Sequence, residues 1–137
     1  MSDLAILRSL QEAIRDGAVP ASIVPTLPVK YIGISWATPS DQQWLEIVWL
    51  PNNRTSDFWA SEKNHQGILR LILHWPNDNS GAYSPLEAIE SIASYFTKGM
   101  MINQVQIYQP PDSQGVLEIG HENLYPVTLR YQSFRTS

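Results

Sequence analysis

The sequence predicts an α+β fold: a mixed, mainly antiparallel sheet with two helices packed on it. Three observations lead to this prediction. Two segments repeat apolar residues at helical spacing. Other apolar segments are short, rich in β-branched and aromatic residues, and separated by turn residues. Helical patterns are absent between most of these strands, which argues against a doubly wound fold. The expected order is one helix, three strands, a second helix, and two or three strands.

The first helix is expected to run from about Asp3 to Asp16, with Ser2 as its cap and Gly17 as its stop. Steps of three and four residues predict an apolar face that carries Leu4, Leu7, Leu10 and Ile14. The following segment, 17–28, holds three prolines and is expected to be an extended connector.

Three strands are expected next. The first covers 29–36 and the second covers 43–50, where Pro51 closes it. The third covers 68–75 and is closed by Pro76.

The second helix has the strongest local signal in the sequence. Ser84 is a capping residue, Pro85 stands at the first helical position and Glu87 at the third. Gly99 is expected to end the helix, whose apolar face would carry Leu86, Ile89, Ile92, Ala93 and Phe96. Further strands are expected at 105–108, 116–119 and 124–134.

The second strand is apolar on both of its faces. One face would carry Leu45, Ile47 and Trp49, and the other Trp44, Val48 and Leu50 around the charge of Glu46. Both faces should then be covered, the second by more of the same chain or by another subunit. Trp44 and Val48 are therefore candidate interface residues. Glu46 is expected to face water or to pair with Arg70 across the sheet.

Residues 51–67 are expected to form a polar loop, longer than an ordinary hairpin loop. Large aromatic residues in such a loop are typical of contact surfaces, so Arg54, Phe58 and Trp59 are candidate interface residues. The alternative is that Phe58 and Trp59 fold back as a small apolar cluster.

The composition indicates one soluble domain spanning 1–137, since 43% of the 137 residues are apolar and 16% are charged. The net charge is −4 and the basic residues are scattered, which argues against specific nucleic-acid binding. There is no cysteine, so disulfides and thiolate chemistry are excluded. The N-terminal segment has the pattern of neither a secretory signal nor a membrane span.

No motif predicts catalysis, a cofactor or a metal site. His65, His74 and His121 lack the spacing of a helical metal site, and no nucleophile-elbow or phosphate-loop motif is present. His74 is expected on the sheet surface or in a hydrogen bond. A general-base role for His121 beside Glu122 is a weak alternative.

Four segments resemble the tail-terminator or tail-completion proteins of long-tailed bacteriophages, including related small phage proteins of uncharacterised function. They are ILRSLQEAI near the N-terminus, WLEIVWLPN at 44–52, the stretch from Gly67 to Phe96, and YPVTLRYQSF at 125–134. The resemblance extends from about residue 4 to 134, and its motifs are architectural instead of catalytic.

The resemblance implies a homohexameric ring that caps the growing tail tube, stops its polymerisation and offers a surface for head–tail joining. The implied partners are further copies of the chain, the tail tube protein and the head–tail connector or stopper, without a membrane. DNA would pass through the ring lumen, which an acidic balance suits. The implied location is the head-proximal end of the virion tail, after assembly in the host cytoplasm.

Two alternatives remain open at this point. One is another head–tail joining or minor tail protein. The other is a cytosolic small-molecule-binding or enzymatic α+β domain, which would hold a pocket between sheet and helices.

Overall fold

The computed structural model describes residues 3–22, 27–33, 42–52, 62–76, 83–103, 105–119 and 122–136. The elements follow the predicted order. They are α1 Asp3–Ala13, continued by the π-helical turn η1 Ile14–Ala18, then β1 Val29–Lys30, β2 Trp44–Asn52, β3 Glu62–Pro76, α2 Tyr83–Tyr95, β4 Met101–Ile102, β5 Val105–Ile107, β6 Asp112–Ser113, β7 Leu117–Ile119 and β8 Glu122–Thr136. The prediction of two helices on a mixed, mostly antiparallel sheet is confirmed.

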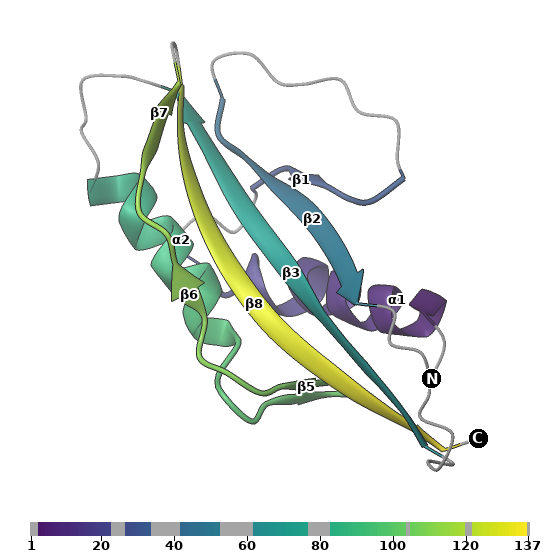
Figure 1. Cartoon of the computed structure of the whole chain (residues 1–137). Coiled ribbons are helices and arrows are strands. Elements are labelled where there is room, and N and C mark those ends of the chain that lie inside the picture. The colour runs from purple at the N-terminus through teal and green to yellow at the C-terminus, as the bar shows by residue number, and fades with distance from the viewer. Residues whose placement is uncertain are drawn as a thin grey trace.

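The described strands form one twisted sheet in the order β1-β2-β3-β8-β5-β4 (Figure 1). Only β1 is parallel to its neighbour. β3 and β8 pair along all fifteen residues of each strand and form the centre of the sheet. The other edge of β8 pairs in turn with β7, β6 and β5.

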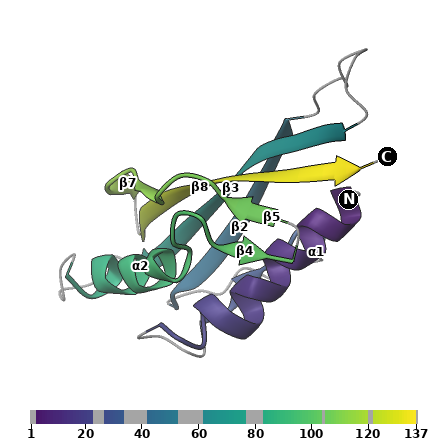
Figure 2. The same ribbon diagram turned by 90° about the horizontal axis from the view of Figure 1, so that it is seen from below.

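Both helices lie on the same side of the sheet (Figure 2). The core is between these two layers. It is formed by buried residues of the helices and of alternate strand positions, among them Ile6, Leu10, Ile14, Leu45, Ile47, Leu69, Leu71, Leu73, Ile89, Ile92, Phe96, Val127 and Leu129. The expected apolar face of the second helix is therefore correct, as is the inward face of the second strand.

The first helix differs from the prediction in two ways. Its buried stripe is Ile6, Leu10 and Ile14, while Leu4 is 66% exposed on the side away from the sheet. Gly17 is not a stop, because the helix continues through it as the turn η1, where the amide of Val19 donates to the carbonyl of Ile14 (3.0 Å). The expected cap, Ser2, lies outside the described residues.

Several strand boundaries were also wrong. β1 is only two residues long and leads into a turn at Ile32 and Gly33, whose φ is +78°. Pro51 does not close β2, which continues to Asn52. Of the described strands, only β1 pairs with the outer edge of β2, and it reaches only to Glu46. An edge position tolerates proline because no partner needs its missing N–H.

The expected loop 51–67 is shorter than predicted. β3 begins at Glu62, so both ends of that segment are strand, and residues 53–61 lie outside the description. Residues 62–67 contain no apolar side chain and have a weak strand propensity. They are nevertheless strand because they pair with β8.

The remaining differences are smaller. α2 begins at Tyr83, one residue before the expected cap Ser84, and ends at Tyr95. Gly99 instead forms the turn that follows, with a φ of +87°, and its amide donates to the carbonyl of Ile107. β5 and β7 confirm the short strands expected near residues 105 and 117. β4 and β6, of two residues each, were not predicted.

Candidate interaction surface

The face of the sheet turned away from the helices carries the alternate residues of β2, β3 and β8 (Figure 2). Neither described helix covers it. Trp44 and Pro126 on this face are buried. Its other apolar members are partly or largely exposed, and with Leu117 of β7 they include Val48, Leu50, Ile68, Ile72 and Leu124. Leu50 is 47% and Leu117 54% exposed. An apolar sheet face of this kind is typical of a protein–protein contact.

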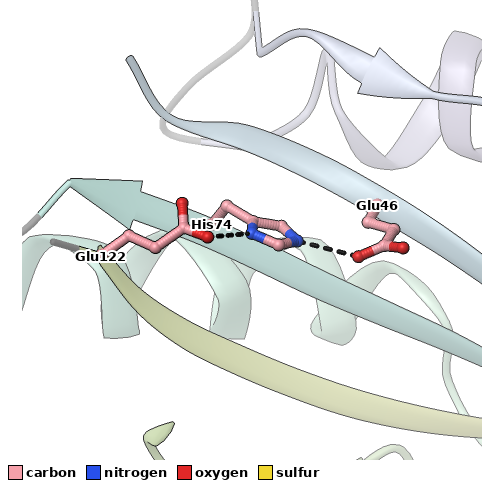
Figure 3. A network of polar contacts seen from close by, with 3 residues as sticks. All are labelled: Glu46, His74 and Glu122. Atoms are coloured by element: carbon pink, nitrogen blue, oxygen red, sulfur yellow. Dashed lines mark hydrogen bonds and ion pairs between the residues drawn. The ribbon is translucent and has the colours of Figure 1, made fainter. Parts of the chain in front are cut away.

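One end of this face is fixed by a polar ladder across three strands (Figure 3). Nε2 of His74 in β3 lies 2.9 Å from Oε1 of Glu46 in β2. Nδ1 of the same ring lies 3.0 Å from Oε1 of Glu122 in β8. Ionised carboxylates only accept hydrogen bonds, so the imidazole serves both when each of its nitrogens carries a proton. Charge-assisted hydrogen bonds then tie the central strands together.

Trp44 adds a second contact to the same histidine. The rings of Trp44 and His74 are stacked, with centroids 3.8 Å apart and planes 8° apart. Trp44 is only 6% exposed. Trp44, a candidate interface residue, is therefore buried at one end of the open face. Val48, the other candidate on this strand, is partly exposed on the same face.

The sequence-based pairing of Glu46 with Arg70 was wrong, because Glu46 bonds to His74 instead. His74 itself is hydrogen-bonded, as expected. The ladder was missed because the acids gave no sign of grouping in the sequence. It depends on the strand register, which places Trp44 opposite His74 and Glu46 two residues further along.

Arg70 occupies the middle of the open face. Its Nε is buried without a hydrogen-bond partner among the described residues. The same is true of Oγ1 of Thr128, which stands opposite Arg70 in the register and is 1% exposed. A buried polar group without a partner costs about 1–3 kcal/mol. Thr128 is sealed from solvent, whereas Arg70 as a whole is partly exposed.

The open face also has a shallow depression beside Leu50. Its volume is about 280 Å³, and its lining includes Leu50, Ile68, Tyr108 and Arg130. Arg130 has Asp112 at 4.0 Å, a weak and exposed pair.

A groove lies between the exposed side of α1 and Tyr31. Its volume is about 460 Å³, and it is lined by Leu4, Leu7, Arg8, Gln11, Glu12, Arg15 and Tyr31. The side chain of Gln11 accepts a hydrogen bond from the amide of Ile32 (2.8 Å), which holds the turn after β1 against the helix.

The charged groups of the groove differ in their surroundings. Arg15 forms an ion pair with Asp16 at 2.9 Å, and this hydrogen bond lowers the pKa of Asp16. Burial raises the pKa of the Tyr31 hydroxyl, with a smaller opposing effect from Arg15. Neither Arg8 nor Glu12 forms an ion pair with another described residue. Asp16 and, to a smaller degree, Glu12 raise the pKa of Arg15, so Glu12 already lies near one cation of the groove.

Other candidates from the sequence are not placed. Arg54, Phe58, Trp59 and His121 lie outside the described residues, so their expected roles stay predictions. No group of three potential metal ligands occurs among the residues described. None of the described helices is long and apolar enough to span a membrane.

Comparison with known proteins gives a family match over nearly the whole chain. The family model for phage tail terminator proteins matches residues 5–131. One solved structure, 18% identical in sequence, superposes with a TM-score of 0.78 over 97% of this chain and 96% of its own. At this identity the likeness shows a shared fold. No curated protein matches the sequence.

Proposed function

The chain belongs to the phage tail terminator protein family, and from this premise we propose that it caps the tail tube as a ring. Membership makes it a structural component of the virion tail, which decides against the enzymatic alternative. In the proposed role the ring, a homohexamer, ends tube polymerisation at the head-proximal end. The side of the ring that faces away from the tube then binds the head–tail connector or stopper. DNA passes through the lumen of the ring.

The open face of the sheet is the observation that carries this proposal. Exposed apolar residues such as Leu50 lie next to an arginine whose Nε has no partner among the described residues. Arginine and large apolar side chains are enriched where protein interfaces are buried. Contacts that join two different surfaces of a subunit generate closed rings when the rotation closes. The open face and the α1 groove are two such surfaces, because they are made of different residues.

Val48 and Trp44 are proposed to contribute to this contact in different ways. Val48 would touch the neighbouring subunit directly, because it is partly exposed. Trp44 would act indirectly, because its ring stacks on His74 and holds that side chain in place.

A tube-capping assay tests the proposal. Tail tube protein is polymerised with and without this chain, and tube lengths and end structures are measured by electron microscopy. We expect shorter tubes, each with a ring at one end. Native mass spectrometry across concentration should detect the ring itself. Unchanged tube lengths together with a strictly monomeric chain, even in contact with tubes, would contradict the proposal.

A further inference from the structure

We propose that the open sheet face of one copy binds the outward side of α1 in the next copy, with Arg70 facing Glu12. This rests on the proposed ring and names its subunit contact. The two surfaces are made of different residues, so a contact between them is head-to-tail. Each added copy then has one surface of each kind left unoccupied.

Each surface has an exposed leucine and a hollow lined in part by apolar side chains. Leu50, 47% exposed, projects from the open face. The α1 groove of about 460 Å³ has an apolar wall of Leu4, Leu7 and Tyr31 that can receive it. Leu4 is the most exposed of the large apolar residues described, at 66%. In the proposed contact, Leu4 of one copy enters the depression of about 280 Å³ beside Leu50 of the other copy.

Arg70 on the open face can also meet a carboxylate in the groove, where Glu12 lines the wall together with Arg8 and Arg15. Val48 stands opposite Arg70, which makes Leu50 the diagonal neighbour of Arg70 on the open face. Glu12 lines the same groove as Leu4 and forms no ion pair with another described residue. Seating Leu50 in the groove therefore brings a carboxylate to the arginine. The apolar contacts around the pair exclude water and strengthen it.

A charge-reversal series tests the ionic half of the contact. Arg70→Glu places two acids at each contact, and Glu12→Arg places two cations there. Each single variant should raise the concentration for half-assembly by on the order of tenfold or more. The double variant carries the reversed pair at every contact and should recover most of the wild-type assembly. Circular dichroism checks that each variant is folded.

Disulfide trapping tests the apolar half, because the chain has no cysteine of its own. A variant with Leu50→Cys and Leu4→Cys should form a ladder of cross-linked multimers under mild oxidation. Only bonds between copies can build such a ladder, because a bond within one copy leaves a monomer. The matched control pairs Leu50→Cys with Met101→Cys, which is 57% exposed but outside the groove, and it should remain monomeric on a non-reducing gel.

The outcomes separate this contact from the ring itself. If the wild type assembles, but the double charge variant is not rescued and no ladder forms, the contact is wrong and the ring stands. If the wild type stays monomeric with tail tubes, both proposals are overturned. Rescue together with a ladder specific to the Leu4–Leu50 pair supports both.

Discussion

The indole Nε1 of Trp49 donates a hydrogen bond to the hydroxyl of Tyr131 at 2.7 Å, although their strands, β2 and β8, are not adjacent. The bond spans β3 at Gly67, which stands opposite Tyr131 in the register. A Cβ at Gly67 would meet the Tyr131 ring. The missing side chain thus lets a tyrosine cross the central strand and join two strands that otherwise do not touch.

Gly67→Ala should therefore lower the free energy of unfolding by roughly 1–3 kcal/mol, because the added methyl displaces a buried ring. Denaturant unfolding measures this loss. Trp49→Phe removes the other end of the bond, and the effects of the two substitutions should be less than additive by about 0.5 kcal/mol or more. Strict additivity would show that the glycine acts independently of the bond.

Gly17→Ala is expected to destabilise the packing of η1 on α2. A Cβ at this position would meet the ring of Tyr95, which lies against the glycine. The expected loss is again roughly 1–3 kcal/mol. Tyr95→Leu in the same chain should recover part of it, since it removes the ring that the methyl meets. A Gly17→Ala variant as stable as the wild type would contradict this account.

Much of the fold could be predicted from local patterns. The periodicity of residues 86–96 gave the buried face of α2, and the alternation of residues 127–131 gave the inward side chains of β8. The face of α1 was predicted less well, because leucines occur on two sides of the helix and periodicity alone does not say which side packs. Gly17 was misread since its lack of a side chain serves packing instead of helix termination.

The candidate surface could be predicted only in outline. The two apolar faces of residues 44–50 indicated that one face would need a cover. The partners of Glu46 could not be found, because His74 and Glu122 are brought to it by strand pairing over long stretches of sequence. The groove between α1 and Tyr31 depends in the same way on tertiary contacts.

The ladder at His74 yields a double-mutant prediction. His74→Gln should lower the free energy of unfolding by about 1.5–3 kcal/mol, because it weakens two charge-assisted hydrogen bonds. Its effect should couple to that of Glu46→Gln by at least about 0.5 kcal/mol. Met101→Ala is the control, because Met101 lies on β4 at the opposite edge of the sheet and is 57% exposed. Its effect should be additive with that of Glu46→Gln.

Tyr31 provides a pH prediction. Burial raises its pKa in the folded chain above the ordinary value of about 10. The neutral hydroxyl of Tyr31 is therefore favoured in the folded chain, and its contribution to the free energy of unfolding is fully present below the unfolded pKa. This contribution is lost as the pH rises through the folded pKa. Unfolding free energies measured across this alkaline range should fall more steeply for the wild type than for Tyr31→Phe. Parallel curves would rule out the burial of this hydroxyl as the cause.

Phe58 and Trp59 are predicted from the sequence to be contact residues. Replacing both with serine should impair assembly more than it lowers the stability of the monomer. Thermal melts and native mass spectrometry measure the two effects. An equal loss in both would show that the pair belongs to the core.

The last described strand, β8, occupies the interior of the sheet and pairs with four others. Its pairing with β3 joins residues far apart in the chain, from Pro76 with Glu122 to Glu62 with Thr136. During synthesis the sheet therefore cannot be completed until β8 has left the ribosome. Until then β3 has an open edge that can pair with other chains. The sheet of each subunit must consequently fold after β8 has been translated.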